Sequence, residues 1–284
     1  MIHYPIYKSE DKKYSPFDEY KVEASKVPEL SAIESSIKRL YINYESAVAA
    51  ESVHTLKPHG FSAPEKDLLK GLYKHNCKPA KRIREHHNDF TKTTKRIYNN
   101  KCPYCVLSEP NTIEHILPKD TYPEYAIHMY NLIPCCSTCN GHKGTSVQDS
   151  AGLPQVLNLY YHDPESLRFL EVDCAIDSNG KPLFTYKLAF PTTEDSALKT
   201  IIANHYNRLH LLERYNEEVI NSYIPVENMI ISTCKGKSLN GALQFLNDYL
   251  SRISSEYGLN HYYIALMRCL INSPVYHNYL LTIL

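Results

Sequence analysis

Three segments in the middle of the chain decide how that part folds: residues 102–105 read CPYC, residues 112–119 read TIEHILPK, and residues 131–144 read NLIPCCSTCNGHKG. The first and third segments each contain a Cys-x-x-Cys pair, and together they supply Cys102, Cys105, Cys136 and Cys139. Four thiolates suit zinc in both their softness and their tetrahedral geometry. We therefore predict a structural Zn²⁺ that closes the loop between the pairs and supplies much of this segment's folding free energy.

A neighbouring cysteine, Cys135, competes with Cys136 as a zinc ligand. Only Cys136 has the two-residue spacing to Cys139, so we favour Cys136. The chain has 9 cysteines, and an odd number argues against a complete disulfide framework. We expect the cysteines outside the zinc site to be buried thiols that pack as small apolar groups.

The spacing within the third segment places chemistry on one helix face. Cys136, Cys139, Asn140 and Lys143 follow the spacing i, i+3, i+4, i+7, which is one side of a short helix. A helix tethered through zinc would direct Asn140 and Lys143 toward the segment that carries the first cysteine pair. Gly144 follows as a natural helix stop.

Glu114 and His115 lie between the two cysteine pairs, so we expect both to face the same place. Adjacent residues on a regular strand point to opposite faces. The two side chains can therefore share one site only if the strand bends or ends at this point. Pro118 is consistent with a strand end nearby.

Composition excludes several classes of function. Lys and Arg total 31 and Asp and Glu total 31, so the formal net charge is +0 and nucleic acid could be bound only through a local basic patch. No apolar run reaches the ~18 residues of a transmembrane helix, and the N-terminus lacks a signal-peptide pattern. We expect a cytoplasmic protein with no membrane partner. The 24 tyrosines, with no tryptophan beside them, are expected to pack in the core.

The rest of the chain predicts helices and one hairpin. Apolar residues at helical spacing predict helical regions over residues 1–97 and 191–284, and one helix is expected to open at Thr193 and stop before Pro225. Two apolar runs around Asn179-Gly180 predict a β-hairpin over residues 166–190. With the cysteine-rich module at residues 98–165, these parts predict a mostly helical α+β fold.

The order and spacing of the three segments resemble an HNH endonuclease, the ββα-metal class, with a four-cysteine zinc site. The resemblance covers residues 98–147. The motifs Ile113-Glu114-His115 and Pro118-Lys119, followed by Asn131-Leu132 and then CxxCNxxK, are similar to those of the HNH subunits of Septu-type and retron-associated anti-phage defence systems. It implies a small ββα-metal module, hydrolysis of phosphodiester bonds with DNA as the expected substrate, a catalytic Mg²⁺ or Mn²⁺, and an ATPase partner that controls activity.

The resemblance also implies a role for each motif residue. His115 falls on the general base that activates water, and its ordinary pKa near ~6.5 suits proton abstraction around neutral pH. Glu114 and Asn140 fall on the metal ligands. Asn131 falls on the central Asn, expected to hold the loop and orient the base, and Lys143 would lie near the scissile phosphate. Glu in place of Asp makes a longer metal arm, and Asn at the last motif position leaves few charged ligands. Metal affinity is therefore expected to be modest, with substrate phosphate completing the shell.

A basic stretch, residues 78–101, leads directly into the first cysteine pair. Lys and Arg side chains that meet phosphates release counterions and make binding salt-sensitive. We predict phosphate contacts from five of its residues: Lys81, Arg82, Arg84, Lys95 and Arg96. The alternative is an ordinary solvated face.

Two other functions remain open from the sequence. The chemistry of the motif acts on a phosphate and does not distinguish deoxyribose from ribose, so the substrate could be RNA, such as a tRNA. The module could also be a catalytically inert, zinc-stabilised binding or scaffold protein, which would cut nothing with any ion. Target sequence, strandedness, nicking against double-strand cutting, oligomeric state and the activating signal have no signature in the sequence.

Overall fold

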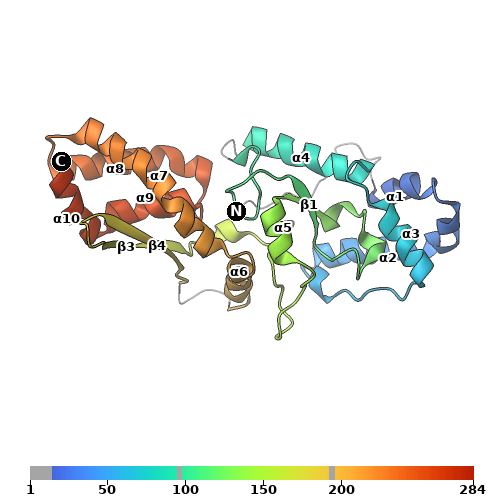
Figure 1. The fold of residues 1–284 in the computed structure, drawn as a ribbon. Coiled ribbons are helices and arrows are strands. Elements are labelled where there is room, and N and C mark those ends of the chain that lie inside the picture. The colour runs from blue at the N-terminus through green and yellow to red at the C-terminus, as the bar shows by residue number, and fades with distance from the viewer. Residues whose placement is uncertain (1–14, 95–97, 192–195) are drawn as a thin grey trace. The chain divides into compact units, whose positions relative to one another are not determined.

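The computed structural model describes residues 15–94, 98–191 and 196–284 (Figure 1). The chain forms two compact units. The N-terminal unit comprises residues 2–163 together with residues 200–209, and the C-terminal unit comprises residues 164–199 and 210–284. Each unit mixes helices with one two-stranded antiparallel sheet, so the predicted mostly helical α+β class is confirmed.

The N-terminal unit begins with helices whose ends are set by local chemistry. The Ser15 hydroxyl accepts a hydrogen bond from the Phe17 amide at the start of the first helix. Ser62 and Glu65 form a capping box before the third α-helix. The α-helices are α1 (Pro16–Ala24), α2 (Glu34–Ala49), α3 (Ala63–Leu72) and α4 (Lys78–Thr94), and the short 3₁₀ helices among them are η1 (Pro28–Ile33) and η2 (Val53–Thr55).

Tyrosines form much of the core, as predicted. The largest fully buried side chains are tyrosines and one phenylalanine: Tyr20, Tyr41, Tyr44, Tyr98, Tyr104, Tyr125, Tyr206, Tyr215, Tyr276 and Phe169. In the N-terminal unit, Tyr41 and Tyr44 of α2 contact the buried ring of His128, with ring centroids 4.5 and 4.4 Å apart. This cluster fixes α2 against the segment that leads into the second strand.

A hairpin and a short helix follow in the same unit. β1 (Thr112–His115) pairs antiparallel with β2 (Leu132–Cys135), with Glu114 opposite Ile133 and His115 opposite Leu132. The connection carries η4 (Pro123–Tyr125) and η5 (Met129–Asn131). α5 (Ser137–Lys143) follows β2 directly and packs against β1, which is the ββα order that the resemblance implies (Figure 1).

The C-terminal unit contains the predicted hairpin. β3 (Leu170–Ile176) pairs with β4 (Pro182–Leu188), and Gly180 turns the chain with a φ of +76°. The Asp177 carboxylate accepts hydrogen bonds from the Asn179 and Lys181 amides, which fixes the turn. The described part of the unit also contains η6 (Pro164–Ser166), α7 (Leu211–Cys234), α8 (Leu239–Tyr257), α9 (Tyr262–Asn272) and α10 (Pro274–Ile283).

The predicted helix from Thr193 to Pro225 is wrong at its end. α6 (Ser196–Arg208) ends early, because His210 adopts a left-handed conformation, and α7 then continues through Pro225 to Cys234. Proline removes one i→i−4 hydrogen bond inside a helix. Pro225 and Asn221, whose carbonyl loses that bond, both lie on the exposed side of α7, where water can replace it. Thr193 itself lies outside the described residues.

No helix in residues 15–94, 98–191 and 196–284 combines the length and apolarity that a membrane crossing requires.

Candidate zinc and catalytic site

The four predicted cysteines come together in the N-terminal unit. The sulfur atoms of Cys102, Cys105, Cys136 and Cys139 all lie within 4.8 Å of one another, and all four residues are buried. The Cys105 and Cys136 sulfurs are 3.8 Å apart. A zinc tetrathiolate with bonds of about 2.3 Å has an S–S edge of about 3.8 Å, whereas a disulfide needs about 2 Å. The cluster therefore has the donor chemistry and spacing of a structural zinc site.

The choice of Cys136 over Cys135 agrees with the geometry. Cys136 is the N-cap of α5, and its sulfur accepts a hydrogen bond from the Cys139 amide at 3.4 Å. Cys135 is the last residue of β2 and lies opposite Thr112, whose hydroxyl is 3.5 Å from its sulfur. The strand thus directs Cys135 away from the cluster, and the helix start directs Cys136 into it.

β1 ends where the motif requires it. After His115 the strand pairing stops, and the next amide, of Ile116, donates to the carbonyl of Asn131. As a result Glu114 and His115, although adjacent, line one pocket of about 300 Å³ together with Asn140 of α5. The other polar residues of its wall are Tyr73, Lys119, Asp120 and Thr145.

His115 is held in one tautomer. Its Nε2 lies 2.9 Å from the carbonyl oxygen of Ala126, and a carbonyl can only accept, so Nε2 carries the proton and Nδ1 has a free lone pair. Tyr73 packs edge-on against the ring at 4.5 Å. Burial lowers the pKa of His115 to about 4, and the bond to Ala126 acts in the opposite direction. The ring is therefore neutral at pH 7 and can accept a proton.

Asn131 is completely buried and uses every hydrogen-bonding position of its side chain. Its Oδ1 accepts from the Leu117 amide at 2.7 Å and from the Tyr44 hydroxyl at 3.1 Å. Its Nδ2 donates to the carbonyls of Leu117 and Tyr125, each at 3.0 Å. Asn131 thus fixes both ends of residues 117–125, the loop before Ala126, and contacts no atom of His115 in these bonds.

Lys143 lies beside Glu114, at a buried position. Its Nζ is 2.6 Å from Glu114 Oε1 and also donates to the His115 carbonyl at 2.9 Å. The side chains of Lys143 and Glu114 are 3% and 5% exposed, so this is a desolvated ion pair. Burial raises the pKa of Glu114, and the charge of Lys143 counteracts the rise.

Asn140 presents its oxygen for another group. Its Nδ2 donates to the Thr112 hydroxyl at 3.2 Å and to the Ile113 carbonyl at 3.3 Å. Among the described residues, neither Asn140 Oδ1 nor His115 Nδ1 has a hydrogen-bond partner. A carboxylate and an amide oxygen at one pocket are the hard ligands that Mg²⁺ and Mn²⁺ prefer, so these residues fit a divalent ion.

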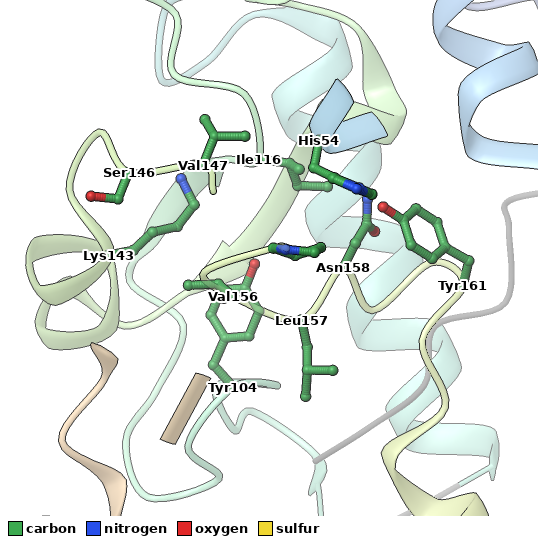
Figure 2. Close-up of a pocket in the computed structure, with 11 residues that line it drawn as sticks. His54, Tyr104, Ile116, Lys143, Ser146, Val147, Val156, Leu157, Asn158 and Tyr161 are labelled. Atoms are coloured by element: carbon green, nitrogen blue, oxygen red, sulfur yellow. The ribbon is translucent and has the colours of Figure 1, made fainter. Parts of the chain in front are cut away.

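A second cavity lies next to Lys143 and is lined mostly by other parts of the N-terminal unit. Figure 2 shows the Lys143 side chain at one side of it, with His54, Tyr104 and Asn158 among the lining residues. Its volume is about 20 Å³, enough for a single water molecule. This cavity is too small for a substrate group, and the motif residues Glu114, His115 and Asn140 line the larger pocket instead, which makes that pocket the candidate reaction site.

The role of α6 at this site has no signal in the sequence. Arg208 donates from Nε and Nη2 to the Lys143 carbonyl at 3.1 and 2.8 Å, at the last turn of α5. His205 Nδ1 accepts from the Leu157 amide, and Asn204 donates to Asp149. Gly144, with a φ of +57°, lets the chain turn beneath Arg208, where a Cβ would meet Nη2 at 3.3 Å. α6 therefore holds the end of α5 and the chain that follows it.

The basic residues predicted to contact phosphate differ in whether they already pair with other groups of the protein. Arg82 pairs with Glu19 at 2.9 Å, and Arg84 donates to the His75 carbonyl at 2.9 Å. Lys81 is exposed and, among the described residues, makes no ion pair. Lys95 and Arg96 lie outside the described residues. Of the three described positions, Lys81 is the one most available to a phosphate.

Comparison with known proteins gives two similarities. The chain is 50% identical over 52 residues to the Septu protein PtuB of Bacillus thuringiensis, a match that covers 16% of this chain and about one fifth (20%) of that protein. It is 26% identical over 219 residues to the protein ea31 of Escherichia phage lambda, covering 72% of each chain. No family model matches, and no solved structure matches. The short match agrees with the resemblance to Septu-type subunits.

Proposed function

We propose that the protein is a metal-dependent HNH endonuclease that hydrolyses phosphodiester bonds in DNA. The observation that carries this proposal is the convergence of His115, Glu114 and Asn140 on one pocket, next to a four-cysteine cluster and within a ββα hairpin-helix. A scaffold would need the cysteines alone. The three pocket residues instead supply a base and two metal ligands, which phosphodiester hydrolysis requires.

Each of these residues has a defined part in the proposed reaction. His115 Nδ1 accepts the proton of the attacking water, while its Nε2–H stays bonded to the Ala126 carbonyl. Glu114 and Asn140 would hold Mg²⁺ or Mn²⁺, and that ion, when bound, stabilises charge on the phosphoryl oxygens and the leaving oxygen. Asn131 is a positioning residue, since it fixes the loop that precedes Ala126.

The proposed biological role is defence against phage, with an ATPase as the controlling partner. Its support is the motif resemblance together with the short, 50% identical match to a Septu protein. Lys81, and the basic stretch around it, would contact the nucleic-acid backbone beside the pocket. The defence role and the ATPase partner are proposed by analogy with the family, whereas the reaction is proposed from the residues of the pocket.

Incubation of the purified protein with supercoiled plasmid and, in parallel, with total RNA tests the reaction. Each substrate is supplied with Mg²⁺, Mn²⁺ or EDTA, with and without an ATPase of the proposed partner class. We expect plasmid cutting that requires the metal and falls at least about 100-fold in His115→Ala, the lower end for loss of a general base. The variant should keep its zinc content. Cutting of RNA alone would reassign the substrate, and equal cutting by the variant would refute the base.

A further inference from the structure

Every carboxylate at the pocket already has a lysine beside it. Glu114 pairs with Lys143 at 2.6 Å, and Asp120 lies 3.9 Å from Lys119 and from Lys70. Taken together with these lysines, the carboxylates that line the pocket therefore bring no net negative charge. A divalent cation approaching this pocket therefore meets little attraction from the protein alone.

The ion pair also occupies one of the two carboxylate oxygens through which Glu114 could bind a metal. Lys143 Nζ lies on Glu114 Oε1 in a buried setting, where a second cation next to the first is strongly repelled. Lys143 has another bond, to the His115 carbonyl. If Lys143 releases the Glu114 carboxylate, its ammonium group still keeps the hydrogen bond to the His115 carbonyl. Release therefore breaks only the contact with Glu114, and the carbonyl dipole still stabilises the lysine charge.

We propose that the Lys143 ammonium serves as a resident cation on Glu114, so that the divalent ion binds together with a nucleic-acid phosphate and not before it. This inference rests on the proposed nuclease function and adds an order of binding to it. A phosphodiester supplies one negative charge and hard oxygen ligands, the two things that the free pocket lacks. Mg²⁺ commonly binds in this way, through one or two carboxylates and the phosphates of its substrate.

The consequence is a nuclease that stays inactive until nucleic acid binds. Free protein would carry zinc but little catalytic metal at cellular concentrations of Mg²⁺. Lys143 would then be a positioning residue in the loaded site, no longer bonded to Glu114. Its role differs from that of a phosphate contact, because its removal strengthens metal binding in free protein, whereas removal of a phosphate contact leaves that binding unchanged.

Mn²⁺ binding, followed by the electron paramagnetic resonance of the free ion, tests the proposal without a cleavage readout. All proteins carry His115→Ala, so that no substrate is cut, and are full length and zinc-loaded at one neutral pH. We expect Lys143→Met to bind Mn²⁺ at least about tenfold more tightly than its parent in the absence of nucleic acid, because a unit charge has been removed from the metal's neighbour. Zinc content and melting temperature confirm that the variant folds.

Lys119→Met is the matched control, because it removes the same charge from the rim of the same pocket but no bond to Glu114. We expect it to change the Mn²⁺ affinity by less than about threefold, since exposed charges are screened. A Lys143→Met protein that binds Mn²⁺ no more tightly than the control overturns the proposal.

A second measurement uses the His115→Ala parent and so does not depend on any substitution at Lys143. Saturating duplex DNA, or single-stranded RNA in a parallel titration, should raise its Mn²⁺ affinity by at least about tenfold, by adding an anionic ligand to the site. If neither polymer raises that affinity, the ordered-binding proposal is wrong. Failure of the nuclease function would appear separately, as an absence of cutting by wild-type protein in the plasmid and RNA assays.

Discussion

Replacement of Asn131 by alanine is the sharpest test of how the loop of residues 117–125 is held in place. The substitution removes four hydrogen bonds at a residue that is 0% exposed, and leaves the Leu117 amide and two carbonyls without their side-chain partner. A net loss of about 1 kcal/mol per bond, with some added cost for the buried groups left unpaired, gives a destabilisation of about 4–5 kcal/mol. Few single substitutions exceed this range.

The assay is urea unfolding of zinc-loaded protein, followed by circular dichroism, with amide hydrogen exchange as a local probe. We expect Asn131→Ala to unfold at clearly lower urea concentration and the Leu117 amide to lose its protection. Tyr44→Phe removes only the 3.1 Å bond to Asn131 Oδ1 and its bond to the Tyr130 carbonyl, so it should cost about 1–2 kcal/mol.

Asn247→Ala is the surface control, because Asn247 is exposed and bonds only within its own helix; it should change stability by less than about 0.5 kcal/mol. The reasoning is refuted if Asn131→Ala unfolds at the same urea concentration as wild type. It is also refuted if Tyr44→Phe costs as much as Asn131→Ala, since the backbone bonds would then contribute nothing.

Two further predictions concern the zinc cluster and the response to acid. Cys139→Ser should lose the bound zinc and lower the melting temperature of the N-terminal unit, while Cys135→Ala should retain the metal, because its sulfur points to Thr112; zinc analysis of both variants decides, and a metal-free Cys135→Ala would contradict the geometry. His128 is fully buried, and burial lowers its pKa to about 3. Its ordinary pKa is about 6.5, so the unfolded chain binds a proton below that pH and the folded protein does not. Stability should therefore be intact above about pH 6.5 and fall by up to a few kcal/mol toward pH 3. In His128→Phe the unfolding free energy should fall less steeply with decreasing pH, as measured by urea unfolding across pH. An equal slope in both proteins would show that His128 is not the cause of the fall.

The zinc site was predictable because its information is local. Two Cys-x-x-Cys pairs indicate the ligands, and the spacing from Cys136 to Cys139 favours Cys136 over Cys135 without any knowledge of the fold. The hairpin was predictable for the same reason, since Asn179-Gly180 specifies its turn. The α7 helix was misjudged because the cost of Pro225 depends on whether the lost bond faces water, which is a property of the packed structure.

The environment of the candidate site was beyond the sequence. The carbonyl that fixes the tautomer of His115 belongs to Ala126, whose side chain carries no signal. The Lys143–Glu114 pair joins residues on a helix and a strand, and their approach to 2.6 Å depends on how α5 packs on β1. Arg208 reaches the Lys143 carbonyl from far along the chain. Contacts of this kind depend on tertiary structure, which residue spacing does not encode.

The contribution of residues 200–209 to the N-terminal unit has a consequence for synthesis on the ribosome. When the hairpin and α5 have emerged, the Lys143 carbonyl and the Leu157 amide still lack the Arg208 and His205 side chains that bond them. All of residues 164–199, including the β3–β4 hairpin, must be translated before those partners appear. Domains fold as units during translation, so the nascent unit stays incomplete through that interval. A chain interrupted before Leu209 would release a cysteine-rich module with an unsupported α5, and completion of the site is thereby tied to translation beyond it.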